Sequence, residues 1–164
     1  MDLQEFNTLS APDAATAIRP CLDVQRWIDE VVTARPYDSV QDAVAQAERS
    51  GAALTADEVD QALAHHPRIG DRAEGESSEA QLSRGEQAGL GSLGDDVKTR
   101  LARGNAAYEE HFDQVFLIRA AGRTPEEILS ELERRMDHTP EQEAAEVADQ
   151  LSQIAALRLE GLLS

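Results

Sequence analysis

Apolar residues recur at helical spacing along most of the chain. Spacings of three and four residues place side chains on one face of an α-helix. Four such groups are Val24, Trp27, Ile28 and Val31; Val40, Ala43, Val44 and Ala47; Val97, Leu101, Tyr108 and Phe112; and Ile128, Leu129, Leu132 and Met136. Only residues 115–118 read as extended, and this run is too short and isolated to found a sheet. The pattern predicts an all-α fold, a single-domain helical bundle over residues 1–164.

Helix-start signals precede several of these groups. Thr55, Thr124 and Thr139 each stand three residues before a Glu or Gln, which is the spacing of a capping box. Ser10 and Ser39 each stand three residues before an Asp. Because Asp is shorter than Glu, we expect these two to form a weaker version of the same cap.

Composition narrows the range of functions. The chain has 164 residues, of which 41% are hydrophobic, enough for one ordinary core. It carries 32 acidic and 15 basic residues, a formal net charge of −17. Such a surface repels phosphate backbones and anionic lipids, so we expect no nucleic-acid partner and no membrane partner. An anionic ligand would need a local cation within the fold.

The single cysteine, Cys21, excludes an internal disulfide and fits a reducing compartment. Its side chain is expected to be a small buried hydrophobe. Residues 1–5 lack the basic and then apolar pattern of a signal peptide, and no apolar run approaches the length of a membrane span. These features favour a cytoplasmic protein.

His66 is the first candidate for proton transfer. Pro67 disfavours helix for the residue before it, so the helix that carries Val59 and Leu63 is predicted to end at His66. An imidazole there would face the negative end of the helix dipole, which favours its protonated form. His66 could instead only cap the last carbonyls. A metal pair with His65 is not favoured, because neighbouring helical side chains point in different directions.

Ser83 and Glu86 allow two interpretations. Ser-x-x-Glu is itself a capping box, in which Ser83 would begin a helix. Alternatively the helix runs from Ser78 through Leu93, with Glu86 on its inward face and Ser83 and Gln87 beside it. The apolar stripe then comprises Leu82, Glu86, Gly89, Leu90 and Leu93. A carboxylate among leucines is costly unless it is paired, which makes Glu86 a candidate site residue.

Arg158 is the third candidate, because it falls on the apolar stripe of the last helix. That stripe comprises Val147, Leu151, Ile154 and Leu162. Since arginine keeps its charge, burial demands an anionic partner. The partner could be a structural carboxylate, such as that of Glu86, or a carboxylate of a substrate. No Cys or His cluster has the spacing of metal ligands, so no metal site is expected.

Several motifs resemble one enzyme family, in order and over nearly the whole chain. They are Leu22-x-x-x-x-Trp27, Arg35-Pro36-Tyr37, His66-Pro67-Arg68-Ile69-Gly70, Ser83-x-x-Glu86-Gln87, Asn105-x-x-Tyr108, Phe116-Leu117-Ile118 followed by Gly122-Arg123, and Leu157-Arg158-Leu159. Together they resemble the 2-oxo-4-hydroxy-4-carboxy-5-ureidoimidazoline (OHCU) decarboxylases of urate degradation. The resemblance implies a commonly dimeric all-α lyase that uses no metal or organic cofactor and converts OHCU to (S)-allantoin.

The resemblance also assigns roles to residues. It implies that His66 is the principal acid/base, positioned by Pro67, with Glu86 and Arg158 as its partners. Further substrate contacts would come from Ser83, Gln87 and a wall of backbone groups at Phe116, Leu117 and Ile118. The chain departs from the family pattern in two places: Arg119 stands where relatives often carry a small residue, and Gln153 where many carry Lys.

Two other functions remain open at this point. A hydrolase or lyase acting on a related ureido compound could use the same His66–Glu86 pair with water, and would release ammonia or an opened ring instead of CO₂. An acidic helical adaptor for partner proteins would need His66 and Glu86 only as caps. The second function predicts that conservative changes at these positions have no effect.

Overall fold

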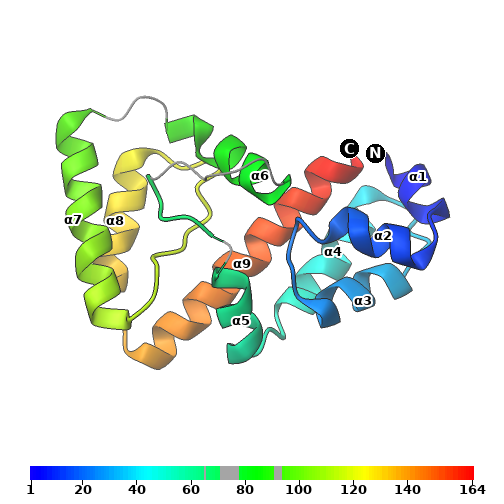
Figure 1. The fold of residues 1–164 in the computed structure, drawn as a ribbon, viewed down its shortest axis with the longest axis horizontal. Coiled ribbons are helices and arrows are strands. Elements are labelled where there is room, and N and C mark those ends of the chain that lie inside the picture. The colour runs from blue at the N-terminus through cyan, green and yellow to red at the C-terminus, as the bar shows by residue number, and fades with distance from the viewer. Residues whose placement is uncertain (65, 71–77, 91–93) are drawn as a thin grey trace. The chain divides into compact units, whose positions relative to one another are not determined.

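A computed structural model describes residues 1–64, 66–70, 78–90 and 94–164 of the chain. Within these residues the secondary structure is helical and contains no strand, which confirms the predicted all-α class (Figure 1). The α-helices are α1 (Leu3–Thr8), α2 (Ala11–Ile18), α3 (Gln25–Thr33), α4 (Val40–Gly51), α5 (Ala56–Leu63), α6 (Ser78–Gln87), α7 (Asp95–Phe112), α8 (Pro125–Arg135) and α9 (Pro140–Leu163), and a 3₁₀ turn, η1 (Ala88–Leu90), follows α6.

The predicted caps begin the helices. At Thr55, Thr124 and Thr139 the hydroxyl accepts from the backbone N–H three residues later, and the threonine N–H donates to the Glu or Gln side chain there. Ser10 and Ser39 accept the same backbone bond. Their hydroxyls, however, donate to the short Asp carboxylate three residues on, at 2.6 and 2.7 Å. These two are the weaker caps that the sequence predicts.

Contacts divide the chain into two compact units. The first unit comprises Met1–Ala64 and Ala148–Ser164, and the second comprises His65–Val147. Helix α9 therefore contributes residues to both units. The interpretation of residues 1–164 as one functional domain stays a prediction.

The core of the first unit forms around α3, which packs against α2 and α4. Trp27 is fully buried there, and its indole N–H donates to the Ala47 carbonyl at 3.0 Å. Helix α9 closely approaches α4, since a Cβ built on Gly51 would lie 2.3 Å from the Ser152 hydroxyl oxygen. A glycine at residue 51 is therefore required for this close packing.

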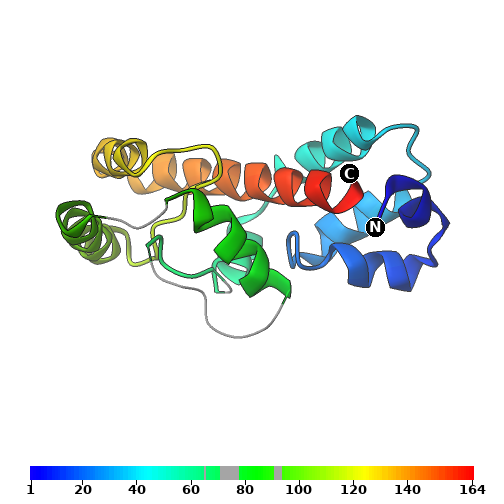
Figure 2. The ribbon, with the colours of Figure 1, turned by 90° about the horizontal axis from the view of Figure 1, so that it is seen from above.

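The second unit is built on α7 and α8, which lie side by side in both views (Figures 1 and 2). Its buried core includes residues of these helices, of η1, and of the segments between α5 and α6 and between α7 and α8. The members are Ile69, Leu90, Leu101, Tyr108, Phe116, Ile118, Ala120, Ile128, Leu129 and Leu132. Because Ile69, Phe116 and Ile118 belong to this core, two segments outside the helices are anchored by it.

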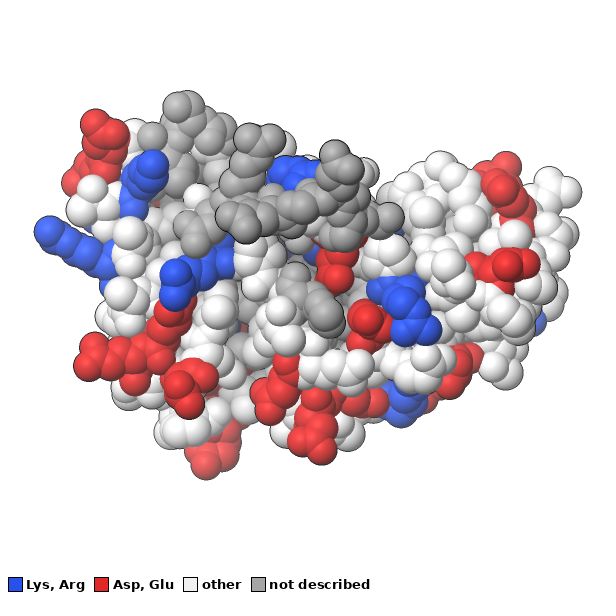
Figure 3. Space-filling view, viewed as in Figure 1, with Lys and Arg blue, Asp and Glu red and all other residues white. Residues whose placement is uncertain are grey.

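The surface reflects the acidic composition. Asp and Glu side chains are spread over the face drawn in Figure 3, with Lys and Arg among them. In the part of the chain that the structure describes, no helix is both long enough and apolar enough to cross a bilayer.

Candidate active site

His66 lies in the irregular segment between α5 and α6. The prediction that the preceding helix ends at His66 is wrong: α5 ends at Leu63, with Ala64 as its C-cap. Pro67 disfavours helix at His66, and here the helix ends even earlier than that restriction requires. The effect of a helix dipole falls off within the last turn of the helix. The dipole of α5 is therefore no reason to expect a protonated His66. The neighbouring His65 lies outside the described residues.

One peptide bond in this segment is held at both of its polar edges. The Ile69 carbonyl accepts from Asn105 Nδ2 of α7 at 2.9 Å. The N–H of Gly70, which belongs to the same peptide, donates to Gln87 Oε1 of α6 at 3.0 Å. Gln87, a predicted substrate contact, therefore also holds the segment that carries His66.

A single row of side chains on α7 supports the same segment. Leu101, Asn105 and Glu109 are spaced four residues apart and so share one face of the helix. Glu109 forms a two-point ion pair with Arg68, with Nε–Oε1 at 2.5 Å and Nη2–Oε2 at 2.8 Å. Gly70 has a φ of +90°, and a Cβ there would meet the Leu101 side chain at 2.7 Å. The row therefore fixes residues 68–70 at three successive positions.

Helix α6 decides between the two interpretations of Ser83 and Glu86. The helix begins at Ser78, so Ser83 lies inside it and does not cap its N-terminus. Ser83 is buried, with 3% of its surface exposed, whereas Glu86 and Leu82 are half-buried. Ser83 is thus a buried polar side chain of α6. The helix ends at Gln87 before the 3₁₀ turn, and residue 93, the predicted end, lies outside the described part.

The predicted wall, residues 116–118, lies in the connection between α7 and α8. As the sequence predicts, it belongs to no helix and to no sheet. Phe116, Leu117 and Ile118 are all buried, with exposed fractions of 1%, 5% and 5%. The Leu117 carbonyl accepts from Arg135 Nη1 at 2.7 Å. The guanidinium carbon of Arg135 also lies 4.6 Å from the centre of the Phe116 ring.

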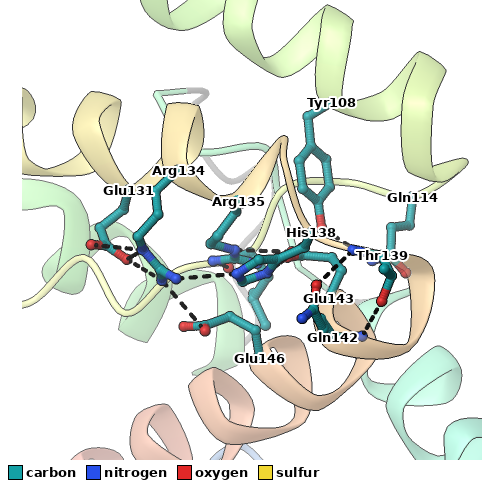
Figure 4. Close-up of polar contacts among 11 residues, drawn as sticks. Tyr108, Gln114, Glu131, Arg134, Arg135, His138, Thr139, Gln142, Glu143 and Glu146 are labelled. Atoms are coloured by element: carbon teal, nitrogen blue, oxygen red, sulfur yellow. Dashed lines mark hydrogen bonds and ion pairs between the residues drawn. The ribbon is translucent and has the colours of Figure 1, made fainter.

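Arg135 and Glu143 form a buried ion pair that sequence reasoning missed (Figure 4). Both side chains are completely buried. Arg135 Nε and Nη2 donate to Glu143 Oε1 at 2.9 and 2.5 Å. Tyr108 donates its hydroxyl to the same oxygen at 2.5 Å, and His138 Nδ1 lies 3.0 Å from Oε2. The two carboxylate oxygens are thereby both satisfied.

A signal for this pair was present in the sequence. Arg135 follows Ile128 and Leu132 at helical spacing, and Glu143 precedes Val147 by four residues. The angular count that identified Arg158 would therefore have placed both charged residues on apolar stripes.

The Tyr108 hydroxyl acts as a hydrogen-bond donor to the Arg135–Glu143 pair. Burial raises the pKa of Tyr108 above its usual range, and the hydrogen bond to the Glu143 carboxylate raises it further. The phenol therefore stays protonated through the neutral range. It also accepts from Gln114 Nε2 at 3.1 Å, which holds the start of the connection to α8.

Arg158 is buried, as its place on the apolar stripe predicts, with 4% of its surface exposed. Its Nη1 donates to the Pro20 carbonyl at 3.1 Å. Arg158 belongs to the first unit, whereas His66, Ser83 and Glu86 belong to the second. That Arg158 shares a site with His66 and Glu86 therefore stays a prediction.

The two departures from the family pattern, Arg119 and Gln153, both make local contacts. Gln153, in the first unit, donates to Asp149 of the same helix at 2.7 Å. Arg119 follows the wall directly, and its carbonyl accepts from Arg123 Nε at 3.0 Å. Among the described residues, no three His, Cys, Asp or Glu side chains are grouped so as to hold a metal ion. The expected metal-free reaction stays a prediction.

Comparison with known proteins identifies the family. The sequence model of OHCU decarboxylases matches residues 7–160, which is nearly the whole chain. The chain belongs to the OHCU decarboxylase family. Membership makes it an enzyme of the decarboxylase class, acting in urate degradation, and bears out the resemblance of its motifs. The comparison with curated protein sequences returned no match.

Two solved structures share the fold. One is a crystal structure of an OHCU decarboxylase in the presence of (S)-allantoin, with 24% identity, a TM-score of 0.69, and coverage of 88% of this chain and 94% of that one. The other is an (S)-allantoin synthase, with 18% identity and a TM-score of 0.72. It covers all of this chain, which spans 54% of the synthase chain.

Proposed function

We propose that this chain converts OHCU to (S)-allantoin and CO₂ without a metal or an organic cofactor, and that His66 is its general acid/base. The family match over residues 7–160 carries the proposal. The arrangement around His66 supports it. Four side chains from α6 and α7 hold residues 68–70, so the imidazole two residues earlier is attached to a fixed backbone.

The chemistry of the substrate explains how the reaction can proceed without a cofactor. The carboxylate of OHCU is attached to a carbon beside a ring C=N bond. When the bond to CO₂ breaks, its electron pair moves into the new C=C bond and the ring nitrogen is protonated. The substrate thus supplies its own electron sink, which other decarboxylases obtain from a bound cofactor. The hydroxyl proton then leaves as the carbonyl forms, and the neighbouring carbon gains a proton.

The protein would supply orientation and proton transfer. His66 would withdraw the hydroxyl proton, a contribution of about 10²–10⁴-fold for a well-placed general base. Glu86 would orient the ureido nitrogens, and Arg158 would hold an anionic or carbonyl group. Ser83, Gln87 and the backbone of residues 116–118 would complete the binding surface. A homodimer and a cytoplasmic location belong to the same proposal.

A protein surface that admits the proton from one side gives one enantiomer of allantoin. A difference of about 2–3 kcal/mol between the two faces would leave the minor enantiomer at roughly one per cent. The test is to add purified protein to freshly generated OHCU after exhaustive chelation, and to follow CO₂ release and circular dichroism. We expect accelerated CO₂ release and a dichroic signal of (S)-allantoin. Racemic product at the uncatalysed rate would refute the activity, and loss of activity on chelation would refute the metal-free mechanism.

A further inference from the structure

The orientation of the Leu117–Ile118 peptide is set by a residue that lies outside the predicted site. The Leu117 carbonyl points to Arg135 Nη1 at 2.7 Å, so this oxygen is already used within the protein. In a trans peptide the N–H points the opposite way from the carbonyl. The Ile118 N–H therefore points away from the guanidinium. Within the described residues, no group accepts a hydrogen bond from this N–H.

Arg135 contacts the wall (residues 116–118) through two groups, and two of its own nitrogens are bound by Glu143. It donates to the Leu117 carbonyl and lies over the Phe116 ring. Its other nitrogens donate to Glu143 Oε1, which Tyr108 also contacts. A planar guanidinium can satisfy a carboxylate and a carbonyl at once because its donors have a fixed fork geometry. Because Arg135 lies on α8 and Glu143 on α9, the direction of the Leu117 carbonyl is tied to both helices.

The pair also changes the chemistry of this peptide. A hydrogen bond from a cation to a carbonyl polarises the whole amide, and hydrogen bonds in such chains strengthen one another. The Ile118 N–H thereby becomes a better donor. Burying two charges costs more free energy than burying apolar residues of similar volume, so stability alone is a weak reason for Arg135 and Glu143 to occupy this place.

We propose that Arg135, held by Glu143, is a positioning residue that orients and polarises the Leu117–Ile118 peptide so that the Ile118 N–H donates to a carbonyl or carboxylate oxygen of the substrate. This inference rests on the proposed function. It also specifies which backbone group of the wall binds the substrate. The Leu117 carbonyl is bound by Arg135, so the donor to the substrate is the Ile118 N–H.

The principal test replaces the charged pair by apolar residues in the double variant Arg135→Met/Glu143→Leu. Such replacements of buried pairs often leave a fold intact. We expect a folded protein whose KM for OHCU rises about tenfold or more while kcat falls less, because a binding donor is misdirected and His66 is left in place. The matched control is Arg100→Met on α7, whose ion pair to Glu133 is on the surface. It should keep KM and kcat within about twofold of the wild type.

A second readout does not depend on turnover. In protein labelled with ¹³C-leucine and ¹⁵N-isoleucine, the Leu117 carbonyl signal should move in Arg135→Lys, because one ammonium group cannot reproduce the three guanidinium bonds. The Ile118 amide signal of the wild-type protein should shift when (S)-allantoin is added, and in Arg135→Lys this shift should be lost.

The outcomes separate the inference from the proposed function. A wild-type protein that is inactive on OHCU but shows the Arg135-dependent Leu117 signal refutes the function and leaves the positioning intact. A folded double variant with wild-type KM and kcat overturns the inference. If neither variant folds, the wild-type titration decides, because an Ile118 amide that does not respond to saturating (S)-allantoin also overturns it.

Discussion

At the scale of single residues, the segment that carries His66 is held by side chains of two helices, α6 and α7. Asn105 and Gln87 bind the two edges of the Ile69–Gly70 peptide, and Arg68 is paired with Glu109. A displacement of about 1 Å in a reacting group can lower a rate by about a hundredfold. Under the proposed mechanism these contacts matter for catalysis as well as for stability.

Replacing His66 by Asn should nearly abolish decarboxylation. Asn keeps a hydrogen-bonding side chain but cannot take up and return a proton near neutral pH, so we expect kcat to fall by about 10²–10⁴-fold. The fold should survive, because His66 is only half-buried and lies outside the helices. Steady-state kinetics and thermal unfolding measure the two effects.

The matched control for this variant is His111→Asn. His111 lies on the exposed face of α7, where its ring contacts Phe112. We expect its kcat to remain at the wild-type value. A His66→Asn protein with wild-type kcat would show that another group performs the proton transfer.

Replacing Gly70 by Ala should destabilise the protein and also lower its activity. The residue has a φ of +90°, and the new methyl group would meet Leu101 Cδ2 at 2.7 Å. We expect a loss of about 1–3 kcal/mol in the free energy of unfolding, from backbone strain and overpacking. Because Gly70 supplies the N–H of the Ile69–Gly70 peptide that Gln87 and Asn105 hold, kcat/KM should fall more than tenfold.

Gly85→Ala is the control for Gly70→Ala, because a methyl group at Gly85 meets no other atom. Gly85 lies inside α6, and nothing lies within 4 Å of a Cβ built there. Alanine should stabilise the helix by about 0.5–1 kcal/mol. Equal effects of the two substitutions in chemical denaturation would contradict this account of Gly70.

At the scale of helices, Arg26 joins three elements of the first unit. From α3 it donates to both carboxylate oxygens of Glu58 on α5, at 2.8 and 3.0 Å. It also donates to the Ser50 carbonyl of α4 at 3.3 Å and to Glu30 at 3.0 Å. The hydrogen bonds from Arg26 lower the pKa of Glu58 below its usual range, and the Thr55 backbone N–H lowers it further.

This lowered pKa makes the Arg26–Glu58 contribution dependent on pH. The stabilisation is fully present above the pKa of an unfolded Glu, about 4.3, and is lost as the pH falls through the lower pKa of the folded state. Glu58→Gln should therefore cost about 1 kcal/mol in the free energy of unfolding at pH 7 and much less at pH 3. Urea denaturation at the two pH values measures the difference. The exposed Glu110→Gln is the control, and an equal cost for Glu58→Gln at both pH values would contradict the assignment.

Helix boundaries were predicted less well than the helices themselves. The stop at Pro67 was recognised, but α5 ends three residues before His66. Helix α6 was expected to continue to residue 93, yet it changes to a 3₁₀ turn after Gln87. The Gln87 side chain at that point is engaged by Gly70, a contact between segments that periodicity does not encode.

At the scale of the whole molecule, the net charge of −17 should influence how an anionic substrate approaches. OHCU carries a carboxylate, so the long-range field opposes association until salt screens it. The screening length falls from about 30 Å at 10 mM to about 8 Å at 150 mM salt. We therefore expect kcat/KM to rise about two- to fivefold over this range.

Steady-state kinetics in NaCl, corrected for uncatalysed decay at each salt concentration, test this expectation. The wild-type kcat should change little, because screening acts on the encounter and not on the bound substrate. A fall of kcat/KM with added salt would instead mean that local arginines dominate the approach.

Local signals were enough to predict the helical class, the caps and the burial of Arg158. Each depends on residues within a few positions of one another, so backbone sterics and one-turn spacing decide it. The family, too, was recognisable from motifs in order. Tertiary structure alone decided that Asn105 and Gln87 hold one peptide, and that Arg135 pairs with Glu143 and donates to the Leu117 carbonyl. A buried polar group must find its partner wherever the folded chain places one, and helical periodicity shows that a group is buried without naming that partner.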